Sequence, residues 1–245
     1  MEIKAVKFRK DGFYSQPFVF GGEEGMDKFD KSVRYRGSLQ NYLIDTGDEA
    51  MNVYLTLDGV SLTNASGPAI WVKQAKNVHL ILAPGTQNAL VSGSEADLAA
   101  FDGTQSGAAV FSEDDLILEG EGELEIYGYI NNGVTCKDDL KIKSGSVRVL
   151  AAGNGLRGSE SVEIKGGEIS VTAGNDGIKS SSSNKEGKGY VTISGGTVIV
   201  EAQGDGISAE TALTISGGTV IVEAQGDGTG QSSKALKAKT GIDIS

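Results

Sequence analysis

The chain has 245 residues, with 33 acidic and 22 basic side chains and a formal net charge of −11 at pH 7. An anionic chain repels nucleic-acid phosphates, so the composition argues against nucleic-acid binding. No apolar run reaches the roughly 18 residues of a membrane-spanning helix, and the charged start MEIKAVKFRK is not a signal peptide.

The first 50 residues differ from the rest in composition and pattern, because they hold eight aromatic side chains and show no repeat period. We expect residues 1–50 to cap the open end of the structure that follows, or to be a foreign segment joined to it. The stretch YRGSLQNYLIDTGDE (35–49) faintly resembles the opening strands of metallo-β-lactamase-fold proteins. The histidine-rich zinc motif of that fold is absent, since His79 is the only histidine.

Residues 51 to about 128 alternate apolar and polar side chains in short runs broken by turn residues. The runs are VYLTLDGVSLTNASGPAIWV (53–72), VHLILAPGTQNALVSG (78–93) and AAVFSEDDLILEG (108–120). Alternation of period two is typical of strands with one buried face. This part of the chain is predicted to form irregular coils of the fold that the following repeats define.

Downstream, the fifteen residues TISGGTVIVEAQGDG occur twice, at 192–206 and 214–228, and weaker copies extend back to residue 116. The Gly-centred step recurs at intervals of 22, 22, 29 and 22 residues, and the polar loop SSSNKEGKG explains the long one. About 22 residues accommodate three short strands and three turns but no crossover helix. We therefore predict an all-β parallel β-helix, a solenoid of about 22 residues per coil spanning 51–245.

The last residues, GIDIS (241–245), match the first strand of another coil, as in VTIS and LTIS. The chain is therefore expected to stop in mid-coil. An uncovered strand edge predicts either truncation of a longer protein or end-to-end self-association.

Asn and Asp recur at the Gly step, and in a β-helix such positions stack into a column along the axis. The column reads Asn132, Asn154, Asp176, Asp205 and Asp227. The segment after Asp227 aligns again at Lys234 (KALKAK against DGISAE), which suggests another loop insertion there. Carboxylates about 4.8 Å apart repel by roughly 3.5 kcal/mol at an effective dielectric of about 20, which favours protonation or a counter-ion. Calcium fits between two rungs, since its oxygen ligands lie about 2.4 Å away on either side. The alternative is that each Asp caps its own turn without metal.

A second acidic column is expected after each Gly step, and basic residues lie between the two columns. The acids proposed as further metal ligands are Asp138, Asp139 and Glu160, preceded by the similar pair Asp114 and Asp115. The basic residues proposed to contact a ligand are Arg157, Lys179 and Lys137. The sequence thus predicts a ridge that alternates acid and base.

Two ordered stretches carry a family resemblance: NGVTCKDDLKIKSGSVRVLAAGNGLRGSESVEIKGGEISVTAGNDGIKS, then GYVTISGGTVIVEAQGDGISAE. Residues from about 52 to 245 resemble the secreted β-helix proteins that bind pectin and cellulose, a family related in fold to family 9 pectate lyases. The resemblance implies a right-handed coil, calcium held on the β-helix, an extracellular or cell-surface location, and binding of acidic plant polysaccharide without proven cleavage. It also implies calcium ligands at Asp176 and Asp205, with Lys179 beside them.

Three functions follow as hypotheses. The first is calcium-dependent, non-catalytic binding of pectin or polygalacturonate, in which Arg157 or Lys179 pairs with uronate carboxylates. The second is a pectate lyase in which Lys179 abstracts the proton next to the uronate carboxylate. The third is a structural or adhesive solenoid. Uncharged cellulose would need a flat aromatic platform, and the coils offer only scattered candidates: Trp71, Tyr127, Tyr129 and Tyr190.

Overall fold

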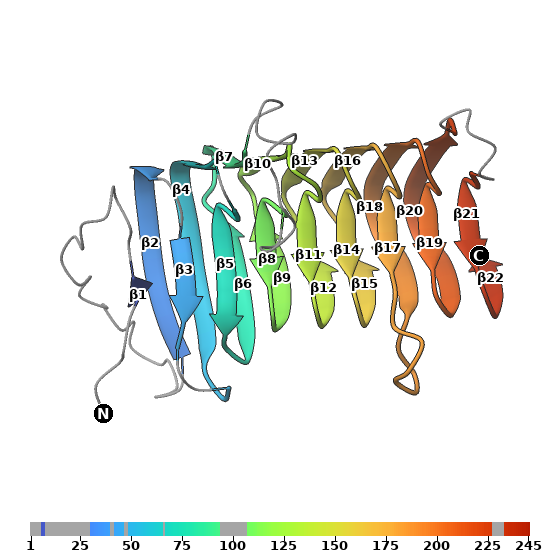
Figure 1. Ribbon diagram of the computed structural model, residues 1–245, viewed down its shortest axis with the longest axis horizontal. Coiled ribbons are helices and arrows are strands. Elements are labelled where there is room, and N and C mark those ends of the chain that lie inside the picture. Colours follow the sequence, from blue (N-terminus) through green and yellow to red (C-terminus); the bar gives the residue numbers. More distant parts are fainter. Residues whose placement is uncertain are drawn as a thin grey trace.

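The computed structural model describes residues 6–7, 30–39, 42–46, 49–65, 67–93, 107–226 and 233–245. Within these ranges the elements are all strands, stacked along one long axis as successive coils of a parallel β-solenoid (Figure 1). The predicted all-β parallel β-helix is thereby confirmed. None of the described residues belongs to a helix long and apolar enough to cross a membrane.

One strand from each coil enters a nine-stranded sheet, which is parallel except where β1 pairs antiparallel with β3. Its members in chain order are β1 (Val6–Lys7), β3 (Tyr42–Asp45), β5 (Ile70–Gln74), β8 (Val110–Ser112), β11 (Val134–Cys136), β14 (Leu156–Gly158), β17 (Ile178–Ser180), β19 (Ile207–Ala209) and β21 (Leu236–Ala238).

The remaining strands form a thirteen-stranded sheet that folds around the other two faces of the coil. They are β2 (Asp30–Leu39), β4 (Asn52–Asn64), β6 (Asn77–Leu82), β7 (Gln87–Ser92), β9 (Asp115–Gly120), β10 (Glu123–Gly128), β12 (Asp139–Ile142), β13 (Ser146–Ala151), β15 (Ser161–Ile164), β16 (Glu168–Ala173), β18 (Tyr190–Ala202), β20 (Ala212–Ala224) and β22 (Gly241–Ile244). Long strands serve both faces: the first half of β18 pairs with β15 and its second half with β16.

The residues paired in register in the nine-stranded sheet give the length of each coil along the chain. Val134, Leu156, Ile178, Ile207 and Leu236 stack in line, at steps of 22, 22, 29 and 29 residues. The first three steps agree with the prediction, but the last predicted step of 22 is wrong. After the second TISGGTVIVEAQGDG copy the chain is polar until Leu236, which is the next large apolar side chain that can enter the core.

The core is a stack of Val, Ile and Leu side chains that point inward from every coil. Leu116, Leu140, Val162 and Val191 are fully buried, and each such aliphatic side chain contributes roughly 1.5–3 kcal/mol by its burial. Space at the corners is equally restricted: a Cβ on Gly155 would lie 2.2 Å from Val171 Cγ1 and 2.6 Å from the Gly177 carbonyl oxygen. The glycine of each step is therefore required by the close approach of neighbouring coils.

Parallel pairing begins before the predicted start of the β-helix at residue 51. β2 pairs in parallel with β4, and β3 pairs in parallel with β5. The division expected at residue 50 therefore does not coincide with a change in strand pairing, and the stretch 35–49 contributes to β2 and β3. Residues 1–5 and 8–29, which hold most of the expected cap, lie outside the described residues.

Candidate functional site

The middle residues of the nine-stranded sheet point outward and stack into one row, which we call the central column. In spatial order it reads Leu43, Trp71, Phe111, Thr135, Arg157, Lys179, Ser208 and Lys237. Neighbouring rungs of a sheet are about 4.8 Å apart. The column therefore changes from apolar and aromatic at one end to cationic at the other.

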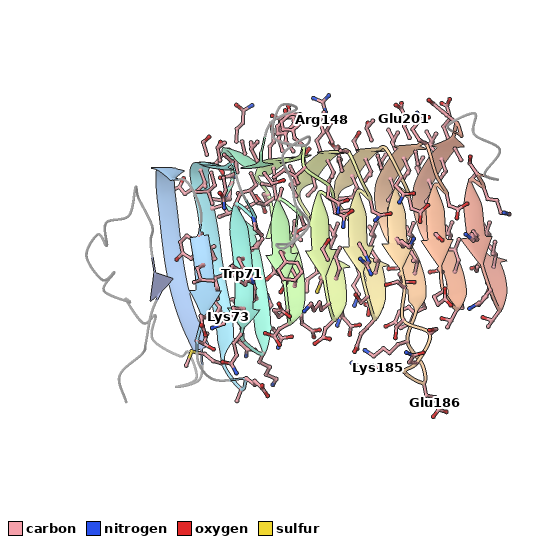
Figure 2. All side chains as sticks on the ribbon, in the orientation of Figure 1. Trp71, Lys73, Arg148, Lys185, Glu186 and Glu201 are labelled. Atoms are coloured by element: carbon pink, nitrogen blue, oxygen red, sulfur yellow. The ribbon has the colours of Figure 1, made fainter. Side chains whose placement is uncertain are left out.

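Trp71 and Phe111 form an aromatic pair on neighbouring strands β5 and β8. Trp71 is 38% exposed and lies on the face turned toward the viewer in Figure 2. The Lys137 ammonium lies 5.5 Å from the centre of the Phe111 ring, within the range of a cation–π contact. Lys137, predicted to bind ligand, thus flanks this pair and also contacts Glu113.

Sequence reasoning missed Phe111, although a local signal was present. The segments GPAIWV (67–72) and GAAVFS (107–112) share their pattern and place Trp71 and Phe111 at the same position. Two of the other candidate aromatics stack on each other instead, since the Tyr127 and Tyr129 rings lie 5.8 Å apart at 16°. Tyr190 donates a hydrogen bond from its hydroxyl to Glu163.

The predicted column of Asn and Asp exists, and its side chains cap the backbone of the next coil. Asn132 Oδ1 accepts the Asn154 backbone N–H at 2.8 Å, and Asp176 Oδ1 accepts that of Asp205 at 2.8 Å. Asp205 Oδ1 in turn accepts the backbone N–H of Lys234 at 3.1 Å. One oxygen of each side chain therefore accepts a backbone hydrogen bond from the following coil, rather than capping its own turn as the metal-free alternative expected.

Lys234 occupies the column position after Asp205, where Asp227 had been predicted. The backbone N–H of Gly206 donates to the Lys234 carbonyl, as that of Gly177 donates to the Asp205 carbonyl one coil earlier. The assignment of this position to Asp227 is therefore corrected by the 29-residue step. Asp227 itself lies outside the described residues.

The second oxygen of each buried carboxylate in the column accepts a hydrogen bond from a lysine ammonium group. Lys179 Nζ lies 2.7 Å from Asp176 Oδ2, and Lys237 Nζ lies 2.6 Å from Asp205 Oδ2. Burial leaves Asp176 and Asp205 only 6% and 5% exposed. A calcium ion bridging these two rungs does not fit this arrangement, because ammonium groups and backbone N–H groups already occupy the oxygens.

The second predicted acidic column is also formed: register places Asp114, Asp138 and Glu160 in line, with Asp115 and Asp139 beside them. Asp114 Oδ2 accepts the Ala75 backbone N–H at 2.8 Å, and Asp115 Oδ1 accepts that of Asp139 at 3.1 Å. Across the described ranges, however, no three His, Cys, Asp or Glu side chains come together in a geometry that could hold a metal ion.

Neighbouring carboxylates of this acidic column differ in the direction in which their pKa values are shifted. Burial, followed by repulsion from Glu160, raises the pKa of Asp138, and burial is also the largest cause that raises the pKa values of Asp114 and Asp115. Burial alone would raise the pKa of Asp139 too, but hydrogen bonds from Ser161 and Lys188 hold that pKa below its ordinary value.

Lys188 and Lys185 come from the loop SSSNKEGKG, and sequence reasoning did not assign them a role. Lys188 Nζ lies 3.0 Å from Asp139 Oδ2 and 2.9 Å from Glu160 Oε2, while Lys185 Nζ contacts the other Glu160 oxygen. The available signal was two lysines in an insertion that follows an acidic repeat position.

Among the residues that the structure describes, Arg157 differs from the lysines of the same face because no ion pair joins it to a carboxylate. Lys73, Lys137, Lys179, Lys237 and Lys239 each form an ion pair with an acidic residue. Arg157 only donates from Nη2 to Ser181 Oγ at 3.3 Å, and its buried Nε has no hydrogen-bond partner among the described residues. The residue three positions before Arg157 is Asn154, which is uncharged, whereas the residue three positions before Lys179 is Asp176.

A family described as carbohydrate-binding domain-containing protein matches residues 33–245. The chain belongs to this carbohydrate-binding domain family. A relative of the same description from Acetivibrio thermocellus (strain ATCC 27405) is 38% identical over 112 residues, which span 44% of this chain and 38% of the relative's length. The chain thus matches well under half of that longer protein.

The chain shares its fold with a solved structure. The polysaccharide lyase-like protein from C. thermocellum, in a gadolinium derivative, is 31% identical with a TM-score of 0.78, and the likeness covers 92% of both chains. The expected resemblance to carbohydrate-binding β-helix proteins is confirmed at the level of the family and the fold. The calcium, the pectin and the metallo-β-lactamase resemblance stay predictions.

Proposed function

We propose that the central column binds a polysaccharide chain laid along the axis of the β-helix, without cleaving it. The observation that carries this proposal is the in-register pair of Trp71, which is exposed, and Phe111, which is half-buried, on the outer face of the sheet. Sugar rings present flat C–H faces that stack on aromatic rings, and a straight column of regularly spaced side chains matches a linear polymer.

Arg157 suggests that the polysaccharide carries carboxylates. Two parallel N–H donors of a guanidinium bind a carboxylate in a bidentate manner, and Arg157 has no acidic partner to compete among the described residues. The net charge of −11 would repel a polyanion as a whole. Binding is therefore expected to be local, with Arg157 as the anionic contact and the aromatic pair as the neutral contact.

The lyase alternative depends on Lys179 acting as a general base. A base needs a free lone pair directed at the substrate, whereas Lys179 Nζ donates to Asp176. We therefore favour binding without catalysis. Incubation of the protein with polygalacturonate and measurement of unsaturated uronate product tests this choice, and product formation that disappears in Lys179→Ala would establish the lyase.

Affinity electrophoresis tests the proposal directly. The protein is run in native gels that contain polygalacturonate, a neutral β-glucan or no polymer, each with and without chelator. Retardation by polygalacturonate that is weakened in both Trp71→Ala and Arg157→Gln is the expected result. Migration unchanged by every polymer tested, for a protein shown to be folded, would refute the proposal and favour a structural solenoid.

A further inference from the structure

The Lys188 ammonium joins carboxylates of two successive coils. Its Nζ lies 3.1 Å and 3.0 Å from the two oxygens of Asp139, on β12, and 2.9 Å from Glu160 Oε2, just before β15. All three N–H donors of an ammonium group can thus be used. This arrangement, one cation between acidic groups on neighbouring rungs, is the one that the sequence had assigned to calcium.

The loop that carries this lysine is tied to the coils at its base. Ser182 donates its backbone N–H to the Ser159 carbonyl at 2.7 Å, and the Gly189 carbonyl accepts from Ser180 Oγ at 2.6 Å and from the Thr211 backbone N–H at 2.8 Å. Gly189 has φ +81°, and a Cβ there would lie 2.2 Å from the Ser182 carbonyl oxygen. These contacts hold the two ends of the loop together. The lysines of the loop are therefore kept close to the acidic column, at a high effective concentration.

Lys185, which Figure 2 shows on the projecting loop, completes the neutralisation of Glu160. Its Nζ contacts Glu160 Oε1, while Lys188 contacts Oε2, so both oxygens of this buried carboxylate face an ammonium group. Glu160 has 10% of its side chain exposed. A carboxylate buried to this degree requires a nearby positive charge if it is to stay ionised.

Lysines also neutralise the buried carboxylates of the column of Asn and Asp. Lys179 forms an ion pair with Asp176, which lies three residues before it in the same coil. Asp205 has Ser208 in the corresponding position, and Lys237 reaches it from the next coil, at 2.6 Å. A lysine therefore reaches both buried carboxylates of this column, even where the local repeat lacks one.

We infer that this chain neutralises its stacked carboxylates with its own ammonium groups, from Lys179, Lys185, Lys188 and Lys237, and that its coils hold together without bound calcium. The directions of the pKa shifts follow from the same contacts. The hydrogen bond to Glu160, and then that to Asp139, raises the pKa of Lys188. The lysine hydrogen bonds outweigh burial to lower the pKa of Glu160.

The test is thermal unfolding of the parent protein, Lys188→Met and the control Lys165→Met, each in chelator and in excess calcium. Lys165 forms an ion pair with Glu163 at 3.1 Å but is 55% exposed, so its loss should shift Tm by less than about 2 °C. The parent is expected to have the same Tm in both buffers. Lys188→Met should lower Tm in chelator by roughly 4–8 °C, because two largely buried carboxylates lose their shared cation.

Calorimetric titration of calcium into the chelator-treated parent gives an independent readout. No saturable binding heat is expected, because the lysines already occupy the carboxylates. A chelator-induced fall in the Tm of the parent, saturable calcium binding by the parent, or a Lys188→Met protein as stable as the parent would each overturn the inference. If Lys188→Met does not fold, Lys185→Met takes its place, with an expected Tm decrease of about 2–4 °C, and the two measurements on the parent still decide.

Discussion

Trp71 and Phe111 lie side by side on the outer face of the nine-stranded sheet, because β5 and β8 pair in parallel with these two residues in register. Residues that are a whole coil apart in the sequence therefore lie on neighbouring strands of the parallel β-helix, about 4.8 Å apart. Neither ring alone would form a platform. Together they continue into Thr135 and Arg157, which gives the face an aromatic part and a cationic part.

Replacing Trp71 by Ala should weaken polysaccharide binding about 5- to 30-fold, since stacking on an exposed aromatic ring contributes on the order of 1–2 kcal/mol. Affinity electrophoresis or a binding isotherm measures the effect. Tyr127→Ala is the matched control, because Tyr127 belongs to β10 in the other sheet. Equal losses in the two variants would contradict binding on the central column.

Replacing Arg157 by Gln should reduce binding of a uronate polymer about tenfold or more and leave binding of a neutral glucan within about twofold. The reason is that a bidentate guanidinium–carboxylate contact is lost, while the aromatic pair remains. Arg148→Gln is the control, since Arg148 is exposed on a different face of the solenoid (Figure 2). A uniform loss for both polymers in Arg157→Gln would indicate a structural role instead.

Replacing Gly155 by Ala should destabilise the fold by about 1–3 kcal/mol, because the new Cβ would lie 2.2 Å from Val171 Cγ1 and force two coils apart. Urea unfolding measures the change. Gly241→Ala is the control, since no atom lies within 4 Å of a Cβ built there, and its effect should stay within about 0.5 kcal/mol. A Gly155→Ala protein as stable as the control would show that the coils can separate freely at this corner.

Replacing Asp138 by Asn should stabilise the protein at pH 7 by about 0.5 kcal/mol. Burial and then Glu160 raise the pKa of Asp138 above its ordinary 3.8, so the folded state binds this proton more tightly and loses stability as pH rises through the folded pKa. Solvent screens the partly exposed carboxylate, which keeps the gain small. Urea unfolding at pH 7 and below pH 3.8 measures the difference in stability between the variant and the parent. This difference should disappear at the lower pH. A variant less stable than the parent at pH 7 would contradict this account.

Most of the fold could be predicted from the repeats, because period and alternation determine register in a solenoid. The positions of Arg157 and Lys179 on one outward column followed from the 22-residue step alone. Insertions interrupt the period: the second one moved the column position from Asp227 to Lys234, where the sequence itself indicated that the alignment resumes. The contacts of Lys188 depend on how a loop folds back across two coils, which no periodic pattern encodes.

The site was predicted less well than the fold, for a related reason. Acidic residues were recognised because they recur, whereas Phe111 belongs to an irregular coil and pairs with Trp71 across a step of 40 residues. The calcium prediction rests on the stacked carboxylates and stays a prediction. Their partners are side chains at other repeat positions, such as Lys237, whose place depends on the length of the preceding loop.

The most direct test of polysaccharide binding on the central column uses the fluorescence of Trp71, which is the single tryptophan of the chain. The emission of the folded protein is followed while polygalacturonate and a neutral β-glucan are titrated in separate experiments. Saturable change in emission, with an affinity for polygalacturonate that falls in Arg157→Gln, is the predicted result. Polymer that demonstrably binds the protein in electrophoresis yet leaves Trp71 emission unchanged would contradict the account and place the binding surface elsewhere.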